Sequence, residues 1–177
     1  MRPTLIATIG PAGAGKTTRR YRHVPPMATV ISLDERRAAL SPCGCSTDQS
    51  VNAAAVETAT ADTRAVLASH GTVVWDVTSY LPRFRAHLLD VAAEFDARTV
   101  GLVVLPPLLT VLAQNSRRDG RVCAVCGTAR RVPEPTVWAM HAAITDALPR
   151  LHTEGWHTLH FLALPPYLRH RHHGRNT

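Results

Sequence analysis

Residues 10–17 constrain this chain more than any other segment. They read Gly-Pro-Ala-Gly-Ala-Gly-Lys-Thr, which fits the pattern G-x-x-x-x-G-K-[ST], and they directly follow a short apolar run at residues 4–9. In a strand–loop–helix unit of this kind, the loop turns its backbone N–H groups inward around a phosphate group. The pattern therefore predicts a parallel α/β sheet with a phosphate-binding loop at the carboxyl end of its first strand.

Lys16 is the only lysine among 20 basic residues, and it stands at the lysine position of this loop. A compact ammonium on a flexible stem can reach between the β- and γ-phosphates, whereas the planar arginine fork is a poor substitute there. The Thr17 hydroxyl is placed for Mg²⁺. The residues expected to bind ATP or GTP in this loop are Gly10, Ala12, Gly13, Ala14, Gly15, Lys16, Thr17 and Thr18.

The rest of the chain alternates short β-branched runs with helical stretches. Strands are predicted at 4–9, 28–33, 72–77, 99–105 and 157–164, and helices at 53–69, 82–95, 107–118 and 135–148. Such alternation predicts a three-layer P-loop NTPase-type fold, in which a parallel five-stranded sheet carries helices on both faces. We expect one P-loop domain over residues 1–164, followed by a basic, loosely ordered tail at 165–177.

Composition excludes several classes of protein. With 177 residues, 45% hydrophobic and 19% charged, the chain can bury one core, and collagen, low-complexity disorder and coiled coils are excluded. Its apolar runs fall far short of the roughly 18–20 residues that span a bilayer, so we expect a cytoplasmic protein without a membrane segment. The formal charge of +7 is compatible with an anionic partner, although the predominance of Arg also fits a GC-rich genome.

Polar residues that follow the second and third predicted strands are candidates for chemistry, because parallel strands end at one edge of the sheet. Asp34 and Arg37 lie three apart and would share one face of a helix. Asp34 could accept a proton from an attacking hydroxyl, or it could be an ordinary helix N-cap. Asp76 could support the Mg²⁺ site, clamp a neighbouring arginine, or simply end a strand.

A further candidate is an arginine-rich segment at about 114–134, which could close as a lid over a triphosphate and stabilise the charge of the transferred group. A solvated basic helix end would have the same composition. The lid arginine could be Arg117, Arg118 or Arg121.

Taken together, these motifs resemble the P-loop polynucleotide 5′-kinases, the family that contains the kinase domain of the phage-type end-healing enzyme and its bacterial relatives. The resemblance spans most of residues 4–150. It rests on the loop at 10–17, Asp34-x-x-Arg37, Asp76-x-Thr78, the helix start Arg83-Phe84-Arg85, and the segment 115–121.

This resemblance implies a role for each matched position. Lys16 and Thr17 would serve ATP and Mg²⁺, and Asp34 would be the general base on the 5′-hydroxyl of DNA or RNA. Arg37 would hold the phosphate of the acceptor, Asp76 would order the Arg37 side of the site, and Arg118 would be the lid arginine. The oligomeric state is left open.

Two cysteine pairs stand apart from these motifs. Cys43-Gly44-Cys45 follows the Asp34 helix, and Cys123-Ala124-Val125-Cys126-Gly127 lies in the predicted lid. Four thiolates at these spacings favour a structural Zn²⁺ ion that would join the lid to the acceptor side of the site. Reduced thiols without metal and, less favoured in a reducing compartment, a disulfide are the alternatives.

Other residues carry less information. We expect Trp75, Trp138 and Trp156 to pack in the interior, and the histidines of the C-terminal tail to be solvent-exposed charge.

Two other functions remain open at this stage. The first is a P-loop kinase that acts on a small molecule such as a nucleoside, an antibiotic or a sugar. The second is a nucleotide-dependent adaptor that binds nucleic acid and has little transferase activity.

Overall fold

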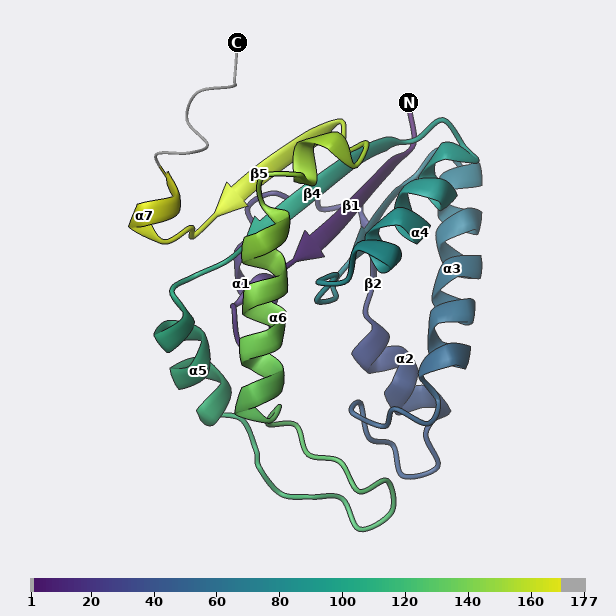
Figure 1. The fold of residues 1–177 in the computed structure, drawn as a ribbon. Helices are drawn as coiled ribbons and strands as arrows, with labels where there is room; N and C mark the ends of the chain where they lie inside the picture. The colour runs from purple at the N-terminus through teal and green to yellow at the C-terminus, as the bar shows by residue number, and fades with distance from the viewer. Residues whose placement is uncertain (1, 170–177) are drawn as a thin grey trace.

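The computed structural model describes residues 2–169 and contains one sheet of five parallel strands in the order β2-β3-β1-β4-β5 (Figure 1). Each strand forms from an apolar, β-branched run, as expected for strands that are buried on both faces. The strands are β1 (Thr4–Ile9), β2 (Thr29–Ile31), β3 (Thr72–Trp75), β4 (Arg98–Val104) and β5 (Thr158–Leu162). The predicted parallel α/β fold is therefore confirmed.

Helices connect each strand to the next, as parallel pairing requires, and one further helix follows β5. They are α1 (Lys16–Arg20), α2 (Leu33–Leu40), α3 (Asn52–Ala68), α4 (Pro82–Ala93), α5 (Leu108–Ser116), α6 (Glu134–Ala147) and α7 (Pro166–Arg169), with a short 3₁₀ turn at Leu151–Thr153. The four predicted helices agree with α3, α4, α5 and α6 to within a few residues at each end. The helix after the phosphate loop is short, because α1 ends at Arg20 and the chain turns towards β2.

The two faces of the sheet are covered unequally. On one face, Leu5, Ala7 and Ile9 of β1 pack with apolar side chains of α3, α4 and α6 in the main core. On the other face, Ile6 belongs to a small cluster that is covered by the segment after α1, including Val24 and Ala28. The alternation of β1 side chains between these clusters is the period of two expected of a strand.

One buried ion pair fixes the chain where it leaves β3. The guanidinium of Arg85 is fully buried; it binds Glu154 at 2.6 Å and 2.8 Å and donates to the backbone oxygens of Ser79 and Tyr80. A buried arginine needs such partners, because an unpaired charge in the interior is strongly destabilising. Arg85, singled out by the sequence pattern, therefore holds the segment after β3 in place.

Some sequence expectations differ from the structure or lie outside it. Trp75 and Trp156 are buried as expected, but the expectation for Trp138 is wrong: its side chain is 57% exposed on α6. In the tail, residues 166–169 form α7, whereas residues 170–177 lie outside the described residues. Within residues 2–169 no helix is both long enough and apolar enough to cross a lipid bilayer.

Candidate functional site

A cleft of about 810 Å³ lies at the carboxyl edge of the sheet. Its walls come from four segments that are distant in sequence: the phosphate loop, the α2–α3 region, the segment from β3 into α4, and the lid (residues 114–134). Lys16 and Asp34 both line it. The fold thus brings the two residues on which the sequence interpretation depends to one cavity.

The phosphate loop has the backbone geometry that its glycines make possible. Gly13 and Gly15 have φ values of 85° and 78°, in the left-handed region that side chains with a Cβ rarely adopt. At Gly10 a Cβ would lie 2.4 Å from the backbone oxygen of Val104, so only glycine fits between β1 and β4. Gly10 and Ala14 are buried beneath the loop, whereas Ala12, Gly13, Gly15, Lys16, Thr17 and Thr18 line the cleft.

Lys16 is held at the base of the cleft. Its ammonium donates to the backbone oxygen of Pro11 at 2.9 Å. Burial away from water lowers the pKa of Lys16 to about 8, with Arg118 acting in the same direction and the carboxylates of Asp76 and Asp34 opposing it. A desolvated cation that lacks a close acidic partner is well suited to bind an anion.

Asp76 lies beside Thr17 at the loop. Its Oδ2 accepts hydrogen bonds from the Thr17 hydroxyl at 2.8 Å and from Nε of Arg20 at 2.9 Å. A hydroxyl and a carboxylate oxygen at this spacing are the hard ligands that Mg²⁺ uses together with phosphates and water. The residues present therefore fit a magnesium site.

The role expected for Asp76 beside Arg37 is corrected by this geometry. Asp76 pairs with Arg20, whose side chain is 10% exposed, and not with Arg37. Arg20 was missed by the sequence analysis, because its contact with Asp76 spans 56 residues and arises only from the turn of α1 over the sheet.

The backbone around Asp76 is fixed by a buried threonine. Thr8 on β1 donates to the backbone oxygens of Trp75 and Val77, at 3.2 Å and 2.7 Å, and accepts from the Val77 N–H at 3.1 Å. The Asp76 N–H also donates to the backbone oxygen of Ile31 on β2 at 2.9 Å. Asp76 is therefore positioned by two neighbouring strands.

Asp34 and Arg37 form an ion pair on the first turns of α2. The N-cap of α2 is Ser32, whose hydroxyl accepts from the Glu35 N–H, so capping does not account for Asp34. Arg37 also donates to the backbone oxygen of Ser46 at 2.7 Å and to the Asn52 side chain at 2.9 Å. Arg37 is thus nearly buried and fixed by three contacts, while the side chain of Asp34 stays 70% exposed.

The lid is joined at its base by Asn115, which is 1% exposed. The Asn115 amide donates to the backbone oxygen of Val132 at 2.7 Å and accepts from the Val132 N–H at 3.2 Å. These bonds hold the two arms of the lid together across 17 residues.

Two lid arginines line the cleft, Arg118 and Arg130. Neither side chain has a hydrogen bond or ion pair to another described residue. Arg130 was not among the sequence candidates. The other two candidates do not line the cleft: Arg117 is exposed at the end of α5, and Arg121 is 91% exposed and pairs with Asp119.

The wall after β3 contains an unsatisfied polar group. The Ser79 hydroxyl is buried and has no hydrogen-bond partner among the described residues, and Ser79 has a φ of 43°. Ser79 lines the cleft together with Tyr80, Arg83 and Phe84. A buried hydroxyl without a partner at a strained position is a common mark of a ligand site.

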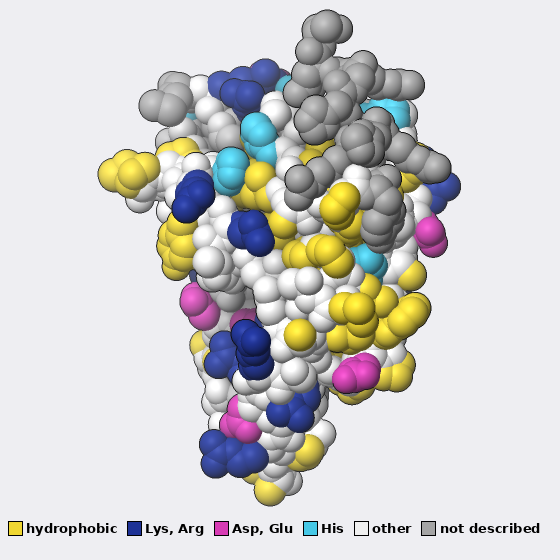
Figure 2. Space-filling model, turned by 90° about the vertical axis from the view of Figure 1, so that its left-hand side faces the viewer, with side chains coloured by type: hydrophobic (Ala, Val, Ile, Leu, Met, Phe, Trp, Pro, Cys, Tyr) yellow, Lys and Arg dark blue, Asp and Glu magenta, His cyan; other side chains and the backbone are white. Residues whose placement is uncertain are grey.

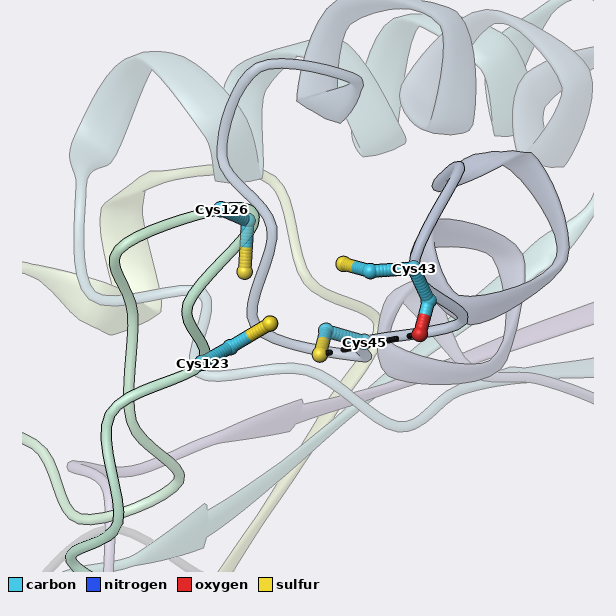
Figure 3. Close-up of side chains that lie close together, drawn as sticks. All are labelled: Cys43, Cys45, Cys123 and Cys126. Atoms are coloured by element: carbon cyan, nitrogen blue, oxygen red, sulfur yellow. Dashed lines mark hydrogen bonds between the residues drawn. The ribbon is translucent and has the colours of Figure 1, made fainter.

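The four cysteines come together where the lid meets the α2–α3 loop (residues 41–51). Their sulphur atoms all lie within 4.8 Å of one another, and all four residues are half-buried (Figure 3). Backbone N–H groups of Cys126 and Val125 lower the pKa of Cys123 to about 6. The sequence placed these residues in two separate loops, and the fold joins the loops.

Basic side chains are dispersed on the face that carries α5 and α7. Figure 2 shows Lys and Arg there in separate groups, with acidic side chains between some of them. Among the described residues, basic side chains therefore do not form one continuous patch on this face.

Known structures share this fold. A chain in the Pnkp1/Rnl/Hen1 RNA repair complex is similar with a TM-score of 0.66 and 16% identity, over 85% of this chain and 46% of that one. Kti12 of Chaetomium thermophilum, solved with ADP-AlF3, gives 0.57 and 20% identity over 90% and 88% of the two chains. The Mycobacterium tuberculosis APS kinase CysC, solved with AMPPNP and APS, gives 0.51 and 17% identity over 66% and 70%.

These identities support the fold alone, and the present chain spans less than half the length of its counterpart in the RNA repair complex. No curated protein matches the sequence. The model of the AAA domain family AAA_33, however, matches residues 5–146, which include the phosphate loop, Asp34, Asp76 and the lid. With its P-loop sheet and the loop geometry described above, the chain therefore belongs to the AAA domain family AAA_33.

Proposed function

We propose that this protein is an ATP-dependent phosphotransferase that moves the γ-phosphoryl group to a hydroxyl, and that its acceptor is the 5′-hydroxyl end of DNA or RNA. The observation that carries the proposal is the presence of Lys16 and Asp34 on one cleft. Phosphoryl transfer needs a cation at the triphosphate and a carboxylate that can receive the proton of the attacking hydroxyl.

In the proposed reaction, the acceptor oxygen forms a bond to the γ-phosphorus while the bond to the β–γ bridging oxygen breaks. The acceptor proton passes to the Asp34 carboxylate, and the nucleoside diphosphate leaves. Lys16, Arg118 and Arg130 would neutralise the charge that spreads over the transferred group, since phosphoryl transfer depends mainly on positioning and charge stabilisation. Mg²⁺, held by Thr17 and Asp76, would supply further charge neutralisation between the phosphates.

Arg37 is better suited to positioning than to binding the acceptor. Its contacts with Asp34, Ser46 and Asn52 occupy all three of its nitrogen atoms. We therefore assign to Arg37 the task of orienting the Asp34 carboxylate towards the acceptor.

The wall after β3 supplies groups for a nucleic-acid acceptor. Arg83 is exposed at the start of α4, lines the cleft and has no side-chain partner among residues 2–169, so it is available for a phosphate. Tyr80 and Phe84 line the same wall, and aromatic rings are the usual stacking partners of bases in single strands. The unpaired Ser79 hydroxyl could bind the sugar.

A small-molecule acceptor is the second candidate. The likeness to a fold found in an RNA repair complex supports the first candidate, and the likeness to APS kinase supports the second.

An acceptor comparison tests the proposal. The protein is incubated with ATP labelled at the γ-phosphate and with 5′-hydroxyl DNA or RNA oligonucleotides, the same oligonucleotides already bearing a 5′-phosphate, and a panel of nucleosides, sugars and aminoglycosides. Label should enter the 5′-hydroxyl oligonucleotides and should be absent from their 5′-phosphorylated controls. Label in the small molecules alone would establish the second candidate, and label in neither would refute the transferase.

A further inference from the structure

We propose that Cys43, Cys45, Cys123 and Cys126 bind one structural zinc ion, and that this ion clamps the lid to the α2–α3 loop beside the cleft. The proposal concerns a site outside the proposed reaction, and it is independent of which acceptor the cleft takes.

The sulphur positions suit a tetrahedral ion. In a zinc site with Zn–S bonds of about 2.3 Å, tetrahedral geometry places the sulphur atoms about 3.8 Å apart. The four sulphur atoms of the cluster lie within 4.8 Å of one another, so side-chain rotation alone can bring them to that spacing. Figure 3 shows two thiols reaching in from the lid and two from the opposite loop, around a common space.

Both loops have the backbone of metal-binding turns. Gly44 and Gly127 have φ values of 70° and 67°, yet a Cβ added at either would meet nothing within 4 Å. Backbone conformation rather than crowding therefore calls for glycine at these positions. In the lid turn, the Cys123 N–H donates to the Thr128 backbone oxygen and the Gly127 N–H donates to that of Cys123, both at 2.9 Å. This turn places Cys123 and Cys126 on the same side.

The outer part of the lid has little else to hold it. Val122 and Val125 are 66% and 73% exposed, so the turn carries no apolar cluster of its own. Beyond the cysteines, the described residues of the two loops are joined by one hydrogen bond, of 2.7 Å, between the hydroxyls of Thr47 and Thr128. A metal–thiolate cluster can replace a hydrophobic core in a segment too small to bury one.

Four thiolates favour zinc in a structural role. Soft sulphur ligands select zinc over Mg²⁺ or Ca²⁺, and a full set of four leaves no open position for substrate or water. All four cysteines are free of disulfide bonds in the structure.

The clamp would connect the two sides of the cleft. The α2–α3 loop carries the Ser46 oxygen that binds Arg37, the partner of Asp34. The lid carries Arg118 and Arg130. In Figure 1 the lid runs from α5 and α6 beneath the sheet towards the loop between α2 and α3, so zinc at their meeting point would close the ring of chain around the cleft.

Metal analysis of the purified protein tests the site. We expect about one zinc per chain, retained after dialysis and released by an organomercurial into a chromogenic chelator. X-ray absorption should report four sulphur neighbours at about 2.3 Å. Cys123→Ser/Cys126→Ser should lose at least tenfold in zinc content, whereas Val125→Ser, a change between the two lid ligands, should keep it.

Several results would overturn the site. They are equal zinc content in the double variant and the wild type, stoichiometric iron in place of zinc, fewer than four sulphur neighbours, or failure of the reduced wild-type protein to take up added zinc. The absorption spectrum of the wild type remains decisive if the double variant does not fold.

Limited trypsin digestion tests the clamp. The zinc-loaded protein should be cut at the lid arginines, such as Arg121 and Arg130, at least tenfold more slowly than the metal-free protein. Cleavage after Arg22, which is exposed in the turn after α1, should not change and serves as the internal control. Equal cleavage of the lid in both forms would refute the clamp even if zinc binds.

Discussion

The phosphate loop and the lid face each other across the same cleft, but they are built in opposite ways. The loop is a contiguous segment at the end of β1, whose first residue, Gly10, packs against the backbone of β4 and whose Ala12 is buried with Val111 of α5 and Val137 of α6. The lid is an exposed excursion between α5 and α6, held at its base by Asn115 and at its tip by contacts with a loop some 80 residues away. Packing thus fixes the first region, whereas the second depends mainly on a few polar contacts and, in our proposal, on zinc bound by the cysteine cluster.

This difference indicates a division of labour. A rigid site pre-orders the N–H groups and the ammonium that would bind a triphosphate, and the carboxylate that would bind its Mg²⁺. A segment with few buried apolar contacts is drawn from the low-stability part of a fold, which suits a part that must admit and release ligands. Variants of the phosphate loop and of the lid can test whether the two regions also differ in their effect on phosphoryl transfer.

The largest loss in the rate of phosphoryl transfer is expected from a change in the phosphate loop. Lys16→Ala removes the ammonium from the base of the loop and should lower the rate of phosphoryl transfer by about 10³-fold. Its thermal unfolding should stay close to that of the wild type, because the lost group is a desolvated charge. Arg19→Ala, an exposed change on the same short helix, is the matched control and should alter the rate less than about twofold. A comparable loss in both variants would mean that net charge, not this position, matters.

A smaller loss in the transfer rate is expected from a change in the lid. Arg118→Ala should lower the transfer rate by about 10²-fold, since it removes one cation that faces the transferred group. Arg117→Ala removes the neighbouring charge, which does not line the cleft, and should leave the rate nearly unchanged. Single-turnover rates of both variants at saturating ATP would check this. If Arg117 proved the more important of the two, the lid would have to adopt another arrangement during the reaction.

The smallest effect is a pH dependence of nucleotide affinity, which is expected to arise from Lys16 in the phosphate loop. The pKa of Lys16 is about 8 in the free protein because the ammonium is buried, and bound phosphates must raise it. Above pH 8, binding therefore takes up a proton, and the affinity for a non-hydrolysable ATP analogue should fall by up to about tenfold per pH unit. Lys16→Ala should bind weakly, with an affinity that does not vary over this range. If the affinity of the wild type did not vary with pH over this range, the Lys16 ammonium could not be the group that binds the phosphates.

The same contrast explains what the sequence could predict. The loop, the five strands and four of the helices follow from contiguous patterns, namely a glycine-rich motif, β-branched runs and helical periodicity. Strand β1 agrees with its predicted range at both ends. Asp34 and Asp76 could be predicted because parallel strands all end at one edge of the sheet.

Contacts between distant segments could not be predicted in this way. The pairing of Asp76 with Arg20, the burial of Arg85 against Glu154 and the position of Arg130 on the cleft depend on how loops fold back over the sheet. In a chain with 19 arginines, composition cannot distinguish the paired from the unpaired ones. The unsatisfied Ser79 hydroxyl leaves no trace in the sequence at all.

Most directly, we propose that Asp34 receives the acceptor proton in the cleft where Lys16 binds the triphosphate. Asp34→Asn tests it most directly, with transfer of labelled γ-phosphate to a 5′-hydroxyl oligonucleotide and ATP-analogue affinity measured on the same protein, and with Glu35→Gln as the neighbouring control. We predict that Asp34→Asn loses about 10²-fold or more in transfer rate while its nucleotide affinity stays within about twofold of the wild type. Transfer at the wild-type rate in Asp34→Asn would contradict the account.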